Sequence, residues 1–231
     1  MKILSFLVKL IFFWRKKKSV VPVVRLSGVI SAAPSLRRGL SLESIEPQLK
    51  KAFSVRSARA VVLIINSPGG SPVQSALIGQ RIRDLAGKAD VPVLAFCEDV
   101  AASGGYWIAA SADEIYANGA SVIGSIGVVS AGFGFDRAIE RIGVDRRVYT
   151  AGRNKMILDP FQPQREEDVE RLRELQMDIH QQFITHLLDR RGSRLKEPHD
   201  DLFSGAFWTG QRAVDLGLID GLGECRQVLG D

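Results

Sequence analysis

Two apolar runs, each followed within a few residues by a pair of glycines, constrain this chain of 231 residues more than any other feature. Residues 60–65 (AVVLII) precede Asn66–Gly70 (NSPGG), and residues 91–96 (VPVLAF) lead to Ala102–Tyr106 (ASGGY). Short apolar runs bounded by turn residues are typical of buried strands, and helix-like segments follow both turns. This repeated order of strand, glycine turn and helix predicts βαβ crossovers in an α/β fold with a mostly parallel sheet.

The two glycine turns also predict where a site would lie. Ligand sites in open α/β sheets lie outside the carboxyl ends of parallel strands, so both turns should open on one edge. Ser103 would stand at a helix N-terminus, where unpaired N–H groups favour negative charge, and we interpret it as a nucleophile. The N–H groups of Gly70 and Gly104 could hold one substrate oxygen. Two alternatives stay open: Ser103 only caps the helix, and residues 66–70 form an ordinary β-turn.

A serine nucleophile needs a base, and the chain has three histidines, His180, His186 and His199. They occur late, in a polar helical region or the loop after it, and the six-residue separation of the first two places them on different helix faces. We therefore expect solvated surface histidines that form neither a catalytic nor a metal-binding pair. A lysine is the remaining candidate, because burial can lower its pKa until the amine accepts a proton, and Ser/Lys pairs are a variant of the catalytic triad.

Five short motifs occur in order along the chain. They are Asn66–Gly70 (NSPGG), Ala102–Tyr106 (ASGGY), Ile123–Val128 (IGSIGV), Ala151–Lys155 with Leu158–Phe161 (AGRNK and LDPF), and Thr209–Ala213 with Gly217–Gly221 (TGQRA and GLIDG). Each motif is weak alone. Their order and spacing, from about residue 21 to residue 223, resemble short members of the signal peptide peptidase A family of serine proteases, peptidase family S49.

The resemblance implies a ClpP/crotonase-like fold of repeated ββα and βαβ units. It also implies that Ser103 is the nucleophile, Lys155 the general base, Ser125 a residue that orients the lysine, and Gly70 and Gly104 the oxyanion-hole donors, with no metal or cofactor. Apolar residues follow Lys155, so its stem could lie in the apolar surroundings that a neutral amine requires. From the residues alone, an exposed loop lysine at 155 and a buried, backbone-bonded serine at 125 remain alternatives.

The same resemblance implies a serine endopeptidase that cleaves signal peptides or other apolar, membrane-derived peptides. Short members of the family form rings in which neighbouring subunits supply the serine and the lysine, so we expect a homo-oligomer. Two other classes remain open. A crotonase-like acyl-CoA enzyme would hold a thioester oxygen between two backbone N–H groups, and a non-catalytic membrane scaffold would keep the fold without turnover.

Residues 1–18 form a separate apolar and basic segment that we expect to contact a membrane. The apolar part ends at Trp14 and is too short to cross a bilayer as a plain helix, which favours a helix lying in the interface. The segment carries six basic and no acidic residues, whereas the rest of the chain carries 25 basic and 26 acidic residues. This distribution favours anionic lipid over nucleic acid as the partner. We expect the bacterial inner (cytoplasmic) membrane, with the side that the catalytic domain faces left open.

Residues 19–231 have the length of a single domain, and no internal repeat or linker divides them. Cys97 and Cys225 have neither disulfide-framework nor zinc-ligand spacing, so we expect free thiols. The patterns predict strands over 21–30, 60–65, 91–96, 114–117 and 146–149, and helices over 42–53, 71–86, 135–142 and 165–191. Gly87 is the predicted stop of the second helix. The last helix carries an apolar stripe, Leu172, Leu175, Ile179, Phe183 and Leu187, suited to the core or to a subunit contact.

Overall fold

The computed structural model describes residues 20–32, 39–152, 154–196 and 199–230. These residues contain a seven-stranded sheet with the order β1-β2-β3-β4-β7, in which β5 joins β3 and β6 joins β5. All pairings are parallel except that of β5 with β6. The strands are β1 (Val23–Ser27), β2 (Val61–Ser67), β3 (Val93–Ala102), β4 (Glu114–Ala117), β5 (Val122–Gly124), β6 (Phe207–Thr209) and β7 (Gly221–Leu222). The predicted α/β fold with a mostly parallel sheet is confirmed.

Strand β3 branches the sheet. Its first half pairs with β4, starting at Leu94 opposite Glu114, and its second half pairs with β5, ending at Ala102 opposite Gly124. The two glycine turns follow β2 and β3, which are parallel neighbours. Their carboxyl ends, and the end of β5, therefore meet at one edge of the sheet.

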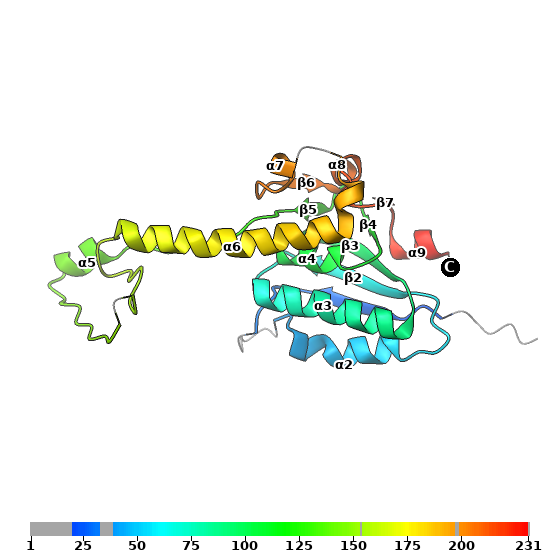
Figure 1. The fold of residues 1–231 in the computed structure, drawn as a ribbon, viewed down its shortest axis with the longest axis horizontal. Helices are drawn as coiled ribbons and strands as arrows, with labels where there is room; N and C mark the ends of the chain where they lie inside the picture. The colour runs from blue at the N-terminus through cyan, green and yellow to red at the C-terminus, as the bar shows by residue number, and fades with distance from the viewer. Residues whose placement is uncertain (1–19, 33–38, 153, 197–198, 231) are drawn as a thin grey trace, which may run out of the picture.

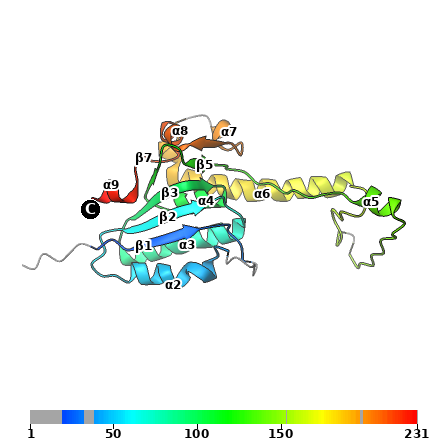
Figure 2. The ribbon, with the colours of Figure 1, turned by 180° about the vertical axis from the view of Figure 1, so that it is seen from behind.

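Helices α2 (Leu42–Phe53) and α3 (Pro72–Ala89) lie together on one side of β1, β2 and β3, as views from the two sides show (Figure 1 and Figure 2). The short helix α4 (Gly104–Ala110), which follows β3, is buried along its whole length. The predicted bounds of α2 are confirmed, and its N-terminus has a capping box between Ser41 and Ser44. The predicted stop of α3 at Gly87 is wrong, because an interior glycine costs a helix only about 1 kcal/mol.

Helix α3 ends instead at Ala89, and the next residue, Asp90, adopts the left-handed conformation with φ 52°. Aspartate enters this conformation more readily than most residues, and the Val91-Pro92 pair that follows disfavours helix. The end of the helix therefore depends on Asp90 and on the Val91-Pro92 pair, all of which lie after Gly87.

Helix α6 (Glu166–Arg191) divides into two halves. Figure 1 shows its C-terminal half beside the sheet and α4, while its N-terminal half projects away from the sheet towards α5 (Asp136–Arg141). Of the predicted apolar stripe, Phe183 and Leu187 are buried, whereas Leu175 is 56% exposed. The apolar stripe therefore contacts the core at its C-terminal end only.

We refer to residues 128–165, which lie between β5 and α6 and include α5, as the arm. The arm lacks the strand predicted at residues 146–149, which have no regular structure. A strand needs a partner with free backbone groups, and no strand of the described sheet runs beside this segment. The arm also exposes large apolar side chains. These include Val129, Phe133, Ile142, Val144 and Tyr149.

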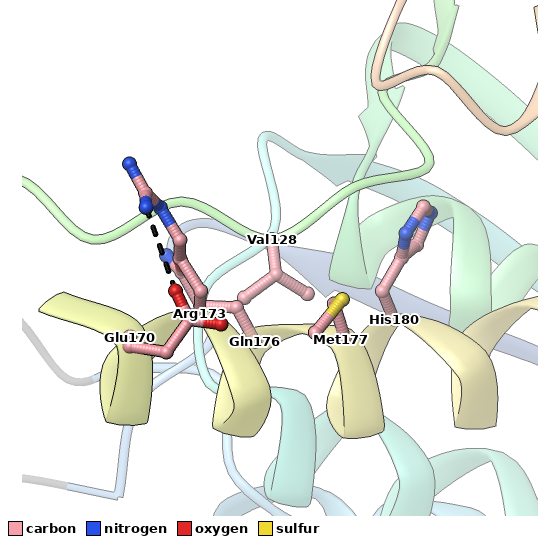
Figure 3. Close-up of a pocket in the computed structure, with 6 residues that line it drawn as sticks. All are labelled: Val128, Glu170, Arg173, Gln176, Met177 and His180. Carbon is pink, nitrogen blue, oxygen red and sulfur yellow. Dashed lines mark ion pairs between the residues drawn. The ribbon is translucent and has the colours of Figure 1, made fainter. Parts of the chain in front are cut away.

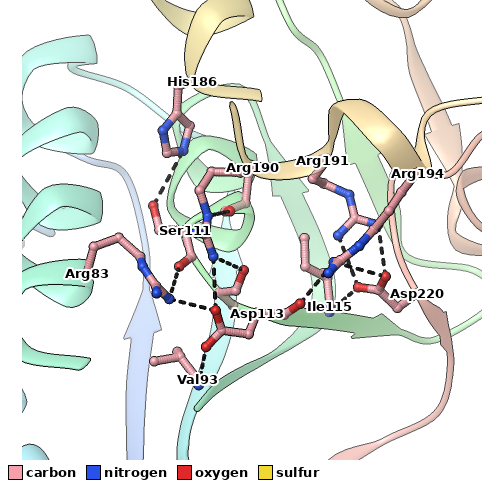
Figure 4. Close-up of polar contacts among 12 residues, drawn as sticks. Arg83, Val93, Ser111, Asp113, Ile115, His186, Arg190, Arg191, Arg194 and Asp220 are labelled. Atoms are coloured by element: carbon pink, nitrogen blue, oxygen red, sulfur yellow. Dashed lines mark hydrogen bonds and ion pairs between the residues drawn. The ribbon is translucent and has the colours of Figure 1, made fainter. Parts of the chain in front are cut away.

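A cluster of charged residues fixes the C-terminal end of α6 to the sheet (Figure 4). The buried Arg191 contacts Asp220 at 3.0 Å and donates to the carbonyl of Gly217. Asp113 pairs with Arg190 at 3.1 Å and with Arg83 at 2.9 Å. Burial alone would raise the pKa of Asp113, but the Val93 N–H and these two guanidinium groups outweigh it and lower the pKa. Paired and hydrogen-bonded in this way, the charges can be held inside the fold.

The remaining short elements pack at the end of the sheet near β6 and β7. They are a 3-10 helix (Gly192–Arg194), α7 (His199–Leu202), α8 (Gly210–Asp215) and α9 (Cys225–Leu229). Both cysteines are free, as predicted, and burial raises the pKa of the Cys97 thiol to about 12. The predicted membrane segment, residues 1–18, lies outside the described residues. Among the residues that are described, no helix combines the length and apolar character needed to cross a bilayer.

Candidate active site

Ser103 lies between the end of β3 and the first residue of α4, just beyond the part of β3 that pairs with β5. Its backbone has φ 51° and ψ −124°, a conformation that L-residues rarely adopt and that costs about 1–3 kcal/mol. Its N–H donates to the carbonyl of Gly124 at 2.8 Å, and its carbonyl accepts from Trp107 at 3.0 Å. Its side chain makes no capping hydrogen bond to α4. Ser103 thus occupies the N-cap position of α4, but its half-buried hydroxyl does not cap the helix.

The two glycine turns are in direct contact. A Cβ atom on Gly69 would lie 2.8 Å from the Cβ of Ser103 and 2.8 Å from the N atom of Gly104. Gly70 is fixed on its other side by Ile30, whose N–H donates to Gly69 and whose carbonyl accepts from Ser71, both at 2.8 Å. The prediction that both turns open on the same edge is therefore confirmed. Within the described part of the chain, the N–H groups of Gly70 and Gly104 have no hydrogen-bond acceptor.

Buried serines hold the first turn in shape. Ser67 is completely buried, donates its hydroxyl to the carbonyl of Gly28 at 2.6 Å, and accepts from the N–H of Gly69 at 3.2 Å. Ser75 donates to the carbonyl of Ser71 at 2.9 Å, and its Oγ lies 2.3 Å from the position that a Cβ on Gly104 would take. Residues 66–70 are therefore more than an ordinary surface turn, because the core fixes them beside Ser103.

Ser125 lies beside Ser103 across the sheet. Ala102, the last residue of β3, pairs with Gly124, the last residue of β5. The residues that directly follow the two strands are therefore Ser103 and Ser125. Ser125 also has a positive φ, of 54°, and its N–H donates to the carbonyl of Ala206 at 2.7 Å. The structure thus brings together four of the five predicted site residues: Ser103, Ser125, Gly70 and Gly104.

The fifth, Lys155, is exposed and belongs to the arm. Its N–H donates to the carbonyl of Gly152 at 3.2 Å. Figure 1 shows the segment that joins α5 to α6 at the projecting end of α6, away from the sheet. A single chain therefore does not place the lysine beside Ser103. Lys155 and the Met156 that follows it are both exposed, so within the described residues the stem of the lysine does not lie in the apolar surroundings expected for it.

This geometry agrees with a comparison of family models, in which residues 86–230 match the model of "Peptidase family S49". This chain belongs to peptidase family S49. The match includes Ser103, Ser125 and Lys155. The fold is thus the mixed α/β, ClpP/crotonase-like fold that the sequence motifs imply.

Three relatives of this S49 chain illustrate the range of the similarity. Protease 4 of Haemophilus influenzae is 33% identical over 218 residues, which are 90% of this chain and 34% of that protein. Serine protease SPPA, chloroplastic, of Arabidopsis thaliana is 32% identical over 209 residues, or 88% and 30% of the two chains. A Brucella abortus protein named Na(+)/H(+) antiporter NhaA is 56% identical over 217 residues, or 94% and 29%.

The S49 chain therefore spans about a third of the length of these three relatives. The antiporter name belongs to a protein most of which lies outside the match. The protease names, in contrast, agree with the family model.

Two histidines of the S49 chain are not the solvated surface residues that the sequence predicts. Both lie on α6 and are half-buried. The Nε2 atom of His180 lies 3.0 Å from the carbonyl oxygen of Ile126, and that of His186 lies 3.1 Å from the carbonyl oxygen of Trp107. The ring of His186 also stacks on Trp107, and burial lowers its pKa. The prediction of solvated histidines is wrong because the polar composition of α6 indicates a helix that faces water, whereas this half of α6 crosses α4 and the Ser125 turn.

An open pocket of about 390 Å³ lies between α6 and the chain just after Ser125 (Figure 3). It is lined by Val128, Glu170, Arg173, Gln176, Met177 and His180. Glu170 and Arg173 form an ion pair of 3.6 Å on its rim. Ser103 does not line this pocket, so it is a neighbour of the candidate site and not the site itself. Within the described ranges, no group of three His, Cys, Asp or Glu side chains could hold a metal ion.

Proposed function

We propose that this chain is a serine endopeptidase with Ser103 as the nucleophile and Lys155 as the general base. One observation carries the proposal: Ser103, whose hydroxyl caps no N–H of α4, has a strained backbone in one glycine turn and packs against the other turn. The N–H groups of Gly70 and Gly104 in these turns have no acceptor in the described part of the chain. Strained residues persist where the surrounding structure holds them and are concentrated at active sites. Preorganised N–H groups beside a hydroxyl suit acyl transfer, because they stabilise the charge that develops on the carbonyl oxygen.

The reaction follows from these positions. The neutral amine of Lys155 takes the proton of Ser103, and the Ser103 oxygen attacks the peptide carbonyl. The N–H groups of Gly70 and Gly104 stabilise the resulting oxyanion. The lysine ammonium then protonates the leaving amine, and water hydrolyses the acyl-enzyme with the same amine as base. The proposal includes no metal or cofactor.

The lysine comes from a neighbouring copy of the chain in this proposal. Lys155 lies on an exposed arm that presents large apolar side chains, and the distal part of α6 adds Leu175 and Met177. Such surfaces are typical of protein interfaces. A head-to-tail contact that places one arm against the next sheet generates a ring when the rotation closes. Ser125, beside Ser103, would then orient the partner's amine.

Substrate class and membrane contact form a second part of the proposal. The substrates would be signal peptides or other apolar peptides, in line with the protease names of the relatives. Residues 1–18 would bind the anionic membrane surface from which such peptides come. Flotation with anionic vesicles tests this part: deletion of residues 1–18 should abolish binding and leave cleavage of a water-soluble peptide unchanged.

The decisive experiment uses two inactive variants. Ser103→Ala and Lys155→Ala should each lower cleavage of an apolar fluorogenic peptide by at least about 10⁴-fold. Mixed in equal amounts and reassembled, they should recover roughly a quarter of the wild-type activity, because a ring site is restored only where an intact serine meets an intact lysine. No recovery from a correctly assembled mixture would reject a shared dyad. A Ser103→Ala variant that cleaves normally would reject the nucleophile and turn attention to acyl-CoA binding or scaffolding.

A further inference from the structure

His180 makes a contact for which the proposed mechanism has no use. Its Nε2 atom lies 3.0 Å from the carbonyl oxygen of Ile126. A carbonyl oxygen only accepts, so Nε2 must carry the proton and donate it. His180 comes from α6, whereas Ile126 directly follows Ser125, 54 positions earlier in the chain. The bond therefore ties the long helix to the turn that carries Ser125.

That turn needs external support. Ser125 has φ 54°, which a residue with a side chain keeps only when its surroundings hold it. Three hydrogen bonds do so: from the Ser125 N–H to Ala206 at 2.7 Å, from the Gly127 N–H to Ser125 at 3.0 Å, and from His180 to Ile126. The first reaches a neighbouring loop and the second lies within the turn itself. Only the third reaches a long helix, itself fixed to the core through Phe183 and Leu187.

The same turn sets the position of Ser103. The carbonyl of Gly124, one residue before Ser125, accepts from the Ser103 N–H at 2.8 Å. A displacement at Ile126 would thus move Ser125 and, through Gly124, the nucleophile. We infer that His180 is a positioning residue of the serine site: by donating to Ile126 it holds the Ser125 turn and aligns Ser103. This inference rests on the proposed function.

Helix α6 gives this contact a second consequence. Near the start of the helix, the buried Asp168 accepts from the N–H of Leu158, in the LDPF motif that follows Lys155. Asp168 and His180 are 12 residues apart, about 18 Å along a helix. One rigid element therefore holds the lysine segment at one end and the serine turn at the other. His180 therefore also helps to set how the serine turn of a chain lies relative to the arm that offers Lys155 to the neighbouring copy.

The test compares His180→Leu, which removes the donor, with His180→Gln, whose amide nitrogen can reach the same position. Gln181→Ala, an exposed neighbour on α6, is the matched control. His180→Leu should lower kcat for a fluorogenic peptide by about 10- to 100-fold with KM within about 2-fold, because the loss is one of alignment. The rate of fluorophosphonate labelling of Ser103 should fall in parallel. His180→Gln should recover most of both rates, and Gln181→Ala should match wild type.

Thermal unfolding and oligomer size are measured on the same samples, so a folding defect is recognised. Unchanged kcat in a folded His180→Leu variant would overturn the inference, as would an equal loss in His180→Gln. Failure of the proposed function looks different, because then wild type itself neither cleaves the peptide nor labels at Ser103.

Discussion

The two parts of the proposed dyad lie in opposite kinds of structure. Ser103 stands where three strands end, with a strained backbone held by hydrogen bonds to Gly124 and Trp107. Lys155 stands on the arm, where Tyr149 is 91% exposed and residues 146–149 form no strand. The sheet determines the geometry around the serine within one chain. The described core does not hold Lys155 beside Ser103, and in the proposed mechanism a neighbouring copy supplies the lysine.

Helix α6 belongs to both regions and shows where the boundary lies. Its C-terminal half is fixed by Phe183, Leu187 and the ion pair of Arg191, while Leu175 in its distal half is exposed. Cooperative core regions and weakly packed segments differ in their local stability. Substitutions in the core should therefore lower the free energy of unfolding, whereas substitutions in the arm should affect assembly and activity.

The largest effect on stability is expected at Asp220. Its replacement by alanine leaves the buried Arg191 without its carboxylate and should lower the free energy of unfolding by about 3–5 kcal/mol. Asp145→Ala, in the arm, removes only a 3.8 Å contact with Arg147 and should cost less than about 1 kcal/mol. Urea denaturation measures both. If Asp220→Ala does not fold, Asp220→Asn should show a smaller loss of unfolding free energy in the same direction. Equal losses for substitutions at Asp220 and Asp145 would contradict the difference in stability between the core and the arm.

A comparison of two glycines should give the next largest effect. A Cβ at Gly70 would lie 2.1 Å from the carbonyl oxygen of Ile30, and φ there is 143°, so Gly70→Ala should cost about 2–3 kcal/mol and lower activity. Gly132, in the arm, has no atom within 4 Å of the same position. Gly132→Ala should change the free energy of unfolding by less than about 0.5 kcal/mol. A stable, fully active Gly70→Ala variant would refute the role of this turn.

Acid should act on the core through Asp113. The pKa of this carboxyl is lowered in the folded state, so the unfolded chain binds the proton more readily. Its contribution to stability is present above its ordinary pKa of about 4 and is lost as the pH falls through the lower folded value. Asp113→Asn should therefore flatten the decline in stability below about pH 4. Urea denaturation midpoints measured from pH 7 to pH 3 test this prediction. If the midpoint of Asp113→Asn falls with pH as steeply as that of wild type, Asp113 does not contribute to acid sensitivity.

The smallest effect on stability is expected at Tyr149. Tyr149→Ser exposes no core atom and should change the free energy of unfolding by less than about 0.5 kcal/mol. The same change should weaken assembly, because it removes an exposed aromatic side chain from the proposed interface. Analytical ultracentrifugation against protein concentration would show this. If the variant assembles as tightly as wild type, Tyr149 does not belong to the interface.

Much of the core could be predicted from the sequence because its signals are local. The apolar run 60–65 and the turn at Asn66–Gly70 together indicate a buried strand that ends in a tight turn. The same logic identifies residues 91–96 and the turn that holds Ser103. Parallel pairing then brings both turns to one edge, so Gly70 and Gly104 follow from the chain order.

The errors share a different cause. The predicted strand at residues 146–149 has suitable composition but no neighbour, and a strand is stable only when paired. His180 and His186 lie on a helix whose composition is polar, yet the helix crosses backbone carbonyls that need donors. In both cases the outcome depends on what lies opposite, which local patterns do not record.

The sequence by itself determined the βαβ order, the bounds of α2, the free cysteines and the turn in which two glycines follow Ser103, because backbone conformation and apolar periodicity act over a few residues. The motifs also indicated the family. Only the tertiary structure decided that the Ser103 hydroxyl does not cap α4, that Ser125 lies beside Ser103, and that Lys155 projects on an arm. It also decided that His180 bonds α6 to the Ser125 turn and that His186 bonds it to α4. These are facts of long-range packing, where a residue's role depends on which distant groups the fold brings within about 3 Å.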